Sequence, residues 1–142
     1  MAIPQIVLDT NVLISGLRSR QGSSFKILSL IGTGKFDIHV SVPLVLEYRE
    51  VLNREIEHLY ITTEQIESVI ALHCSIATQH EIFFLWRPCL RDPKDDMVLE
   101  LAVKARCDSV VTYNIRDFSG IDRFGLNVIT PANFLRNIGI LS

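Results

Sequence analysis

The sequence contains no apolar run that approaches the roughly 18 consecutive residues needed for a membrane-spanning helix. Its N-terminal stretch also lacks a basic segment followed by an apolar one, which is typical of a secretory signal. Low-complexity tracts and internal repeats are absent as well. These absences predict a cytoplasmic protein that has no membrane segment.

Cysteine is scarce: Cys74, Cys89 and Cys107 lie far apart in the chain. An odd number without a paired CxxC spacing supports neither a disulfide framework nor a zinc site. The histidines show no metal-ligand spacing such as HxxxH, and His73 falls on an apolar helical stripe. We therefore interpret the cysteines as free or buried thiols and the histidines as structural residues.

A basic surplus is also missing, because 14 Lys and Arg residues stand against 16 Asp and Glu, for a net charge of −2. Overall charge therefore gives no indication of nucleic-acid binding, and any contact with phosphate has to be local. The 142 residues, 48% hydrophobic and 21% charged, suit one compact core. We predict a single domain over residues 1–142.

What the sequence does contain is an alternation of strand-like and helix-like segments. The expected strands are short β-rich or apolar runs at residues 6–8, 36–42, 81–86, 109–112 and 127–129. The expected helices cover residues 12–17, 25–31, 44–54, 62–77 and 93–106, and a last helix is led by Pro131. Because parallel strands need long crossovers and bury both faces, this alternation predicts an α/β fold with helices on both sides of a parallel sheet.

Asp9 comes directly after the first apolar run, so it is expected at the exit of a buried strand. The carboxyl ends of parallel strands line the ligand crevice of an open α/β sheet, which makes Asp9 a candidate site residue. The alternative is that Asp9 only caps the helix that Val12 begins, a common role for Asp before an apolar run.

Glu47 is the next candidate, because its position on the helix at residues 44–54 differs from that of the other charged residues. At about 100° per residue, Glu47 lies on the edge of the apolar stripe, beside Val51. We predict that it faces a cleft or the rim of the core. The alternative is an ordinary boundary glutamate that extends its carboxylate to water.

The densest charge cluster, RDPKDD at residues 91–96, opens the helix at 93–106. Asp92 is a plausible N-cap, and Pro93 suits the first helical position. The carboxylates of Asp92, Asp95 and Asp96 repel one another, and a bound cation would relieve this repulsion. Helical geometry places Asp95 on the inner face and Asp96 on the polar face with Glu100 and Lys104. Alternatively, Asp95 merely completes a capping arrangement with Asp92.

A second strand end repeats the arrangement at Asp9, since the strand at 109–112 leads into the polar sequence TYNIRD. Acids that follow strands should converge at one edge of a parallel sheet. Hard oxygen ligands gathered there suit Mg²⁺ or Mn²⁺ better than zinc.

Four motifs, in this order, resemble those of PIN-domain ribonucleases, especially the bacterial toxin components of toxin–antitoxin systems (VapC-like). They are VLDTNVLISGL at residues 7–17, Glu47, RDPKDDMVLELA at 91–102 and VTYNIRDF at 111–118. The resemblance implies a three-layer α/β/α sandwich with a five-stranded parallel sheet. It also implies a Mg²⁺-dependent endoribonuclease, with Mn²⁺ as a substitute, that hydrolyses RNA phosphodiester bonds. Implied partners are a small cognate antitoxin and a second copy of the chain in a homodimer.

The resemblance places the family's catalytic, metal-binding acids on Asp9, Glu47, Asp95 and Asp117. Asn114 stands where the family often carries a further Asp, which leaves one or two metal ions open. Residues next to these acids could orient ligands or hold the RNA backbone: Asn11, Thr112, Asn114, Asp96, Asp92, Arg91, Lys94 and Arg116.

Two other classes of function stay open. A phosphohydrolase or phosphoacceptor domain also carries an Asp after its first strand, but the haloacid-dehalogenase pattern has a second Asp where this chain has Asn11. A receiver domain fits the late acids poorly. The other class is a non-catalytic PIN scaffold that binds protein or RNA, although the set of acids is intact. A nuclease assay with and without EDTA separates these possibilities.

Overall fold

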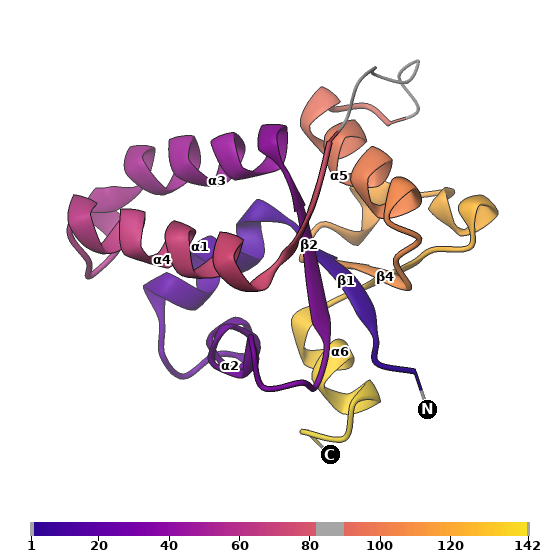
Figure 1. Cartoon of the computed structure of the whole chain (residues 1–142), viewed down its shortest axis with the longest axis horizontal. Helices are drawn as coiled ribbons and strands as arrows, with labels where there is room; N and C mark the ends of the chain where they lie inside the picture. Colours follow the sequence, from indigo (N-terminus) through magenta and orange to yellow (C-terminus); the bar gives the residue numbers. More distant parts are fainter. Residues whose placement is uncertain (1, 82–89, 142) are drawn as a thin grey trace.

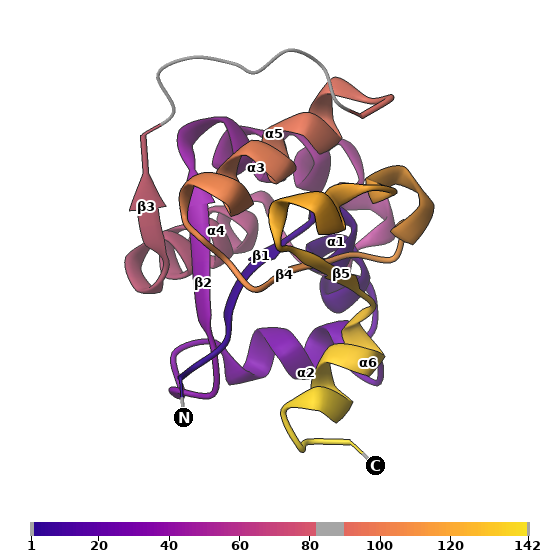
Figure 2. The same cartoon turned by 90° about the vertical axis from the view of Figure 1, so that its right-hand side faces the viewer.

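Five parallel strands form the centre of the computed structural model, which describes residues 2–81 and 90–141 (Figure 1). The strands are β1 (Gln5–Leu8), β2 (Asp37–Ser41), β3 (Thr78–His80), β4 (Ser109–Val111) and β5 (Asn127–Ile129). Their order in the sheet is β3-β2-β1-β4-β5, which Figure 2 shows from left to right. The first strand of the chain is therefore the central one.

The expected burial of the first strand is confirmed. Ile6 pairs with Ile38 of β2 on one side and with Ser109 of β4 on the other. Ile6, Val7 and Leu8 are almost completely inaccessible to solvent. A strand that is covered on both faces reads as a continuous apolar run, as this one does. Asp9 is the first residue beyond it.

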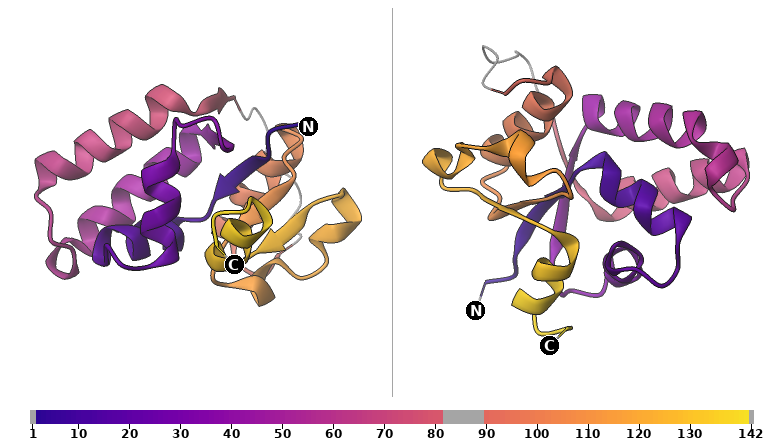
Figure 3. Two further views of the ribbon diagram at one scale, coloured as in Figure 1. Left: turned by 90° about the horizontal axis from the view of Figure 1, so that it is seen from below. Right: turned by 180° about the vertical axis from the view of Figure 1, so that it is seen from behind.

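Helices cover both faces of the sheet, as the alternation predicted. They are α1 (Thr10–Arg18), α2 (Ser23–Leu30), α3 (Val42–Arg54), α4 (Thr63–Ile76), α5 (Pro93–Lys104) and α6 (Pro131–Asn137). Figure 3 shows the indigo to magenta helices α1 to α4 on one side of β1 and the orange α5 on the other. Short 3₁₀ turns η1 (Ile56–His58), η2 (Ile115–Phe118) and η3 (Ile121–Phe124) complete the described elements.

Local capping explains where three of these helices begin. Ser41 accepts a hydrogen bond from the backbone nitrogen of Leu44, so α3 starts two residues earlier than expected. The capping box predicted for α4 is present, because Thr62 and Gln65 each accept the other's backbone N–H. Asp92 caps α5 as expected, accepting from the nitrogen of Lys94 at 2.9 Å.

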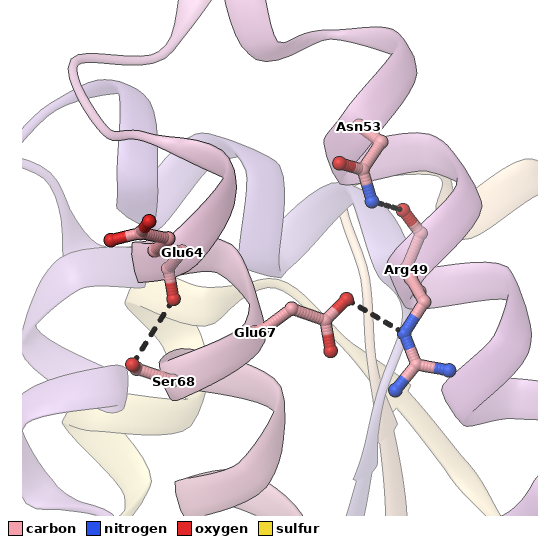
Figure 4. Close-up of polar contacts among 5 residues, drawn as sticks. All are labelled: Arg49, Asn53, Glu64, Glu67 and Ser68. Carbon is pink, nitrogen blue, oxygen red and sulfur yellow. Dashed lines mark hydrogen bonds and ion pairs between the residues drawn. The ribbon is translucent and has the colours of Figure 1, made fainter.

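Helix α3 is held between α4 and the centre of the sheet. On its outer side, Arg49 Nε lies 3.0 Å from Glu67 Oε1 of α4 (Figure 4). On its inner side, the buried Tyr48 hydroxyl donates a hydrogen bond to the carbonyl of Leu8, the last residue of β1. This bond ties the helical turn that carries Glu47 to the strand end that carries Asp9.

His73 of α4 is a structural core residue, as the sequence predicted. Its ring meets Tyr48 edge-on with centroids 5.4 Å apart. Burial lowers the pKa of His73 to about 4, so the imidazole is neutral near pH 7. Its Nε2 has no hydrogen-bond partner among the described residues.

The third strand differs from its predicted position. It was expected at residues 81–86, of which 82–86 lie outside the described residues, whereas β3 occupies Thr78–His80 and pairs with β2 from His39 to Ser41. The physical reason is that β3 is a short edge strand made of polar residues. Such a strand lacks the apolar pattern on which the prediction depended.

The remaining expectations about the chain concern thiols and membranes. Cys74 and Cys107 are free thiols, as predicted, and Cys89 lies outside the described residues. Across residues 2–81 and 90–141, no helix is both long and apolar enough to cross a membrane.

Candidate functional site

A cleft of about 230 Å³ opens at the carboxyl edge of the sheet, between α1, α3 and α5. The sequence candidates that line it are Asp9, Asn11, Glu47, Asp92, Lys94, Asp95 and Asn114. A larger cavity of about 400 Å³ lies near β3 and contains none of these residues. The polar cleft is therefore the one that gathers the expected chemistry.

Asp9 combines the two roles that its position suggested. Its carboxylate accepts a hydrogen bond from the backbone nitrogen of Thr10 at 2.8 Å, so it caps α1. It also accepts from Thr112 Oγ1 at 2.8 Å, and it lines the cleft. Burial raises the pKa of Asp9, and the negative charge of Glu47 raises it further, whereas these two hydrogen bonds lower it; the net effect is a raised pKa. The capping role thus accounts for only part of its environment.

Glu47 turns its carboxylate toward the cleft rather than out to water. Its side chain is only 13% exposed, and its Oε1 lies 3.5 Å from Nζ of Lys94, which is 51% exposed. The ion pair joins α3 to the first turn of α5 across the cleft. An ammonium group therefore sits among the carboxylates.

Asp95 is the buried acid of α5 that lines the cleft. Burial and the negative charges of Asp9 and Asp92 raise the pKa of Asp95 to about 7. A carboxyl group whose neighbours oppose its ionisation stabilises a positive charge placed beside it. Asp95 is thus the side chain that most clearly reports the excess of negative charge in the cleft.

The helical geometry argued for α5 is correct for its two adjacent acids and wrong for Glu100. Asp96 turns away from the cleft and accepts a hydrogen bond from the backbone nitrogen of Leu90 at 2.9 Å. Glu100, expected on an exposed polar face, is buried together with Val98 to Ala102. The reason is that α5 packs against three strands and also against α3, so more than one of its faces is covered.

Thr112 is the centre of a hydrogen-bond network beside Asp9. While its hydroxyl donates to Asp9, it accepts from Asn11 Nδ2 at 3.2 Å and from the backbone nitrogen of Asn114 at 3.0 Å. Three of the residues expected to orient ligands therefore hold one carboxylate. Residues from the ends of β1 and β4 meet in this network.

Asp117 lies in η2, is exposed and is not among the residues that line the cleft. It lies near enough to Asp9 and Asp95 for its negative charge to contribute to their raised pKa values. Arg91 and Arg116 are also exposed and do not line the cleft. The structure thus brings Asp9, Glu47 and Asp95 together in the cleft lining and places Asp117 close enough to act on two of them electrostatically.

Arg54 lines the cleft although the sequence reasoning did not single it out. It follows Glu47 by seven residues, which is two helical turns, so helical spacing could have found it. With Lys94 it gives the acidic cleft two basic side chains near its rim.

The donor set fits a hard divalent cation in chemistry. Carboxylate and amide oxygens line the cleft, and burial, with a further contribution from neighbouring negative charges, raises the pKa values of two of its acids. Within residues 2–81 and 90–141, no group of three His, Cys, Asp or Glu side chains is arranged closely enough to hold a metal ion. The type and charge of the donor groups therefore support binding of a cation. The side chains are nevertheless too far apart in this structure to form a three-ligand cluster.

Comparisons with known proteins agree with the fold. A sequence profile described as the PIN domain matches residues 5–116, which are 112 of the 142 residues and include Asp9, Glu47 and Asp95. VapBC2 from Rickettsia felis, solved bound to a DNA fragment from its promoter, has a chain that matches with a TM-score of 0.57 and 14% identity. That match covers 89% of this chain and 98% of the other. A search of curated protein sequences gives no match. With the profile extending over most of its length, the chain belongs to the PIN-domain family.

Proposed function

We propose that this protein is a metal-dependent endoribonuclease that hydrolyses phosphodiester bonds in RNA. One observation carries the proposal: Asp9, Glu47 and Asp95 come from three separate elements and face one cleft at the carboxyl edge of the sheet. Burial, together with the negative charges of Asp9 and Asp92, raises the pKa of Asp95 to about 7. Membership of the PIN-domain family, which includes nucleases, supports the same reaction class.

Asp9, Glu47 and Asp95, with Asp117 nearby, are the residues that would hold Mg²⁺ or Mn²⁺. When bound, the cation supplies a Lewis acid to the attacking water and to the phosphate. Thr112 and Asn11 fix the orientation of the Asp9 carboxylate, which limits the rotations open to it. Lys94 and Arg54 are placed to attract the RNA backbone at the rim. Arg91 and Arg116, further out, can extend this contact.

Direct attack by water suits this cleft better than a covalent intermediate. The described residues that line it include neither cysteine, serine nor histidine, so a nucleophile paired with an imidazole base is missing there. Carboxylates and amides could instead hold a cation, and a carboxylate could accept a proton from water.

The biological role we propose is that of a toxin component with a small antitoxin partner. The basis is the structural similarity to a chain of VapBC2, together with the PIN-domain match. On the same basis, we propose a homodimer that acts in the cytoplasm. Copurification from the native host tests the partner, and failure to recover a small companion protein from an intact gene pair counts against it.

The first experiment is a cleavage assay on total cellular RNA with and without a divalent cation. We expect cleavage with Mg²⁺ or Mn²⁺ and none after EDTA, because the cleft offers oxygen ligands and no nucleophile–base pair. The Asp95→Asn variant, purified in parallel, controls for contaminating nucleases. Cleavage that persists in EDTA contradicts the metal mechanism, and RNA that is bound but never cut identifies a non-catalytic scaffold.

Lys94→Met is expected to tighten Mn²⁺ binding by about two- to fivefold, measured by isothermal titration calorimetry. The physical reason is that the ammonium group competes with the cation for Glu47, in an ion pair whose lysine is half exposed and therefore weak. Lys26→Met, which removes an exposed lysine of α2, is the matched control and should not change the affinity. Weaker binding by Lys94→Met contradicts the competition between the two cations.

A further inference from the structure

Tyr113 presents an exposed aromatic ring next to the acidic cleft. It lies in the loop after β4, between Thr112, which holds Asp9, and Asn114, which lines the cleft. The residue is 44% exposed, and its ring makes no aromatic or cation–π contact with the described residues. Its large apolar surface is therefore open beside the proposed reaction site.

Both ends of Tyr113 are fixed despite this exposure. At its outer end, the hydroxyl shares a hydrogen bond with Ser24 Oγ at 2.5 Å and accepts one from Ser15 Oγ at 3.3 Å. Ser24 is completely buried, so its position is set by the fold. At the backbone, the nitrogen of Tyr113 donates to Asn11 Oδ1 at 3.3 Å. A ring held by α1 and α2 has little freedom to lose when a ligand covers it.

Asn11 connects this ring to the cleft. Its side chain lines the cleft and also accepts the backbone N–H of Tyr113, so the two features are one hydrogen bond apart. Asn11 bonds the backbone of Tyr113 and Ser15 bonds its hydroxyl, and these two residues are one helical turn apart on α1, so the ring lies along this helix beside the cleft. We expect the base next to a phosphate in the cleft to reach the ring. A planar neutral surface there offers a base a stacking contact that does not depend on its sequence.

We propose that Tyr113 is a stacking platform for an unpaired base next to the phosphate that is cleaved. This inference rests on the proposed ribonuclease function. Bases inside a duplex have both faces covered by their neighbours, whereas an unpaired base can be turned out onto an aromatic side chain. The platform thus selects loops and single strands over continuous helices.

The test measures binding of a short single-stranded RNA that carries 2-aminopurine, whose fluorescence is quenched on stacking. All variants are made in an Asp95→Asn background with Mg²⁺ present, so that cleavage does not interfere. Tyr113→Ala is expected to weaken binding by about 5- to 150-fold and to abolish the quenching. Tyr113→Phe should keep the quenching and lose about threefold or less in affinity, because only the hydroxyl tether is removed.

Tyr60→Ala is the matched control, since Tyr60 is 91% exposed and lies between α3 and α4, outside the cleft lining. It should bind and quench like the Asp95→Asn parent. Circular-dichroism melts show whether each variant is folded. If the Tyr113→Ala variant is not folded, the quenching measured with Tyr113→Phe still tests whether the ring stacks on the base. Equal binding and quenching by the parent and the Tyr113→Ala variant overturn the platform and leave the ribonuclease proposal standing. A preference for duplex RNA also overturns the platform. Wild-type protein that neither binds nor cuts RNA in the presence of Mg²⁺ overturns both proposals.

Discussion

Replacing Asp95 with asparagine is expected to lower RNA cleavage by roughly a thousandfold. The substitution keeps the shape of the side chain and removes its charge from the buried inner face of α5. It should also weaken Mn²⁺ binding in calorimetry, since an amide is a poorer ligand for a hard cation than a carboxylate. Both effects follow only if Asp95 holds the cation.

Asp96→Asn is the matched control, because it changes the adjacent residue on the same helix. Asp96 points away from the cleft toward the backbone of Leu90, so cleavage and metal affinity should remain close to those of the wild type. Thermal melts distinguish a metal-binding role of Asp95 from a role in capping the helix. If Asp95 served only the helix end, Asp95→Asn would cost up to about 1 kcal/mol of stability and leave cleavage intact. An inactive Asp96→Asn variant contradicts the assignment of the ligand.

Asp9→Asn is the second substitution expected to abolish cleavage, again by roughly a thousandfold, while the fold persists. Asparagine is as good an N-cap as aspartate, so the hydrogen bond from the Thr10 nitrogen can be kept. Removing the charge also relieves repulsion from Glu47 and Asp95, and burial no longer opposes an ionised group. The melting temperature should therefore be equal to or higher than that of the wild type.

The comparison with Asp9→Ala makes this test sharper. Alanine removes the cap as well as the charge, so it should be inactive and also less stable by about 1 kcal/mol. Circular-dichroism melts and cleavage rates are measured on the same preparations. If Asp9 were only a structural cap, Asp9→Ala would melt earlier while both variants still cut RNA.

The parts of the site that sequence could predict are those set by local periodicity. Asp9 was identifiable because an apolar run buried on both faces ends immediately before it. Asp95 could be distinguished from Asp96 because one residue rotates a helical position by about 100°. The cap of α4 followed from the spacing of Thr62 and Gln65. Each of these features depends on residues close together in the chain.

The rest depends on contacts between distant segments, for which local patterns carry no signal. The edge strand β3 was not predicted at Thr78–His80 because its polar residues resemble a loop. Glu100 was placed on a polar face because the number of elements packed around α5 is not visible in its own sequence. The bond from Tyr113 to Ser24 joins residues that are 89 positions apart. The exposed position of Asp117 in a 3₁₀ turn was likewise not visible in the local sequence pattern.

The hydrogen bond between Thr112 and Asp9 has a consequence for the synthesis of the protein. The two residues are 103 positions apart, although they meet on adjacent strands at the centre of the sheet. At ordinary rates of translation, Thr112 is added roughly 5 to 20 s after Asp9. Throughout this interval β1 lacks its neighbour β4. The carboxylates of the cleft are then on segments that have not yet packed together around β4. The cleft of the proposed nuclease can therefore be completed only after β4 has been synthesised.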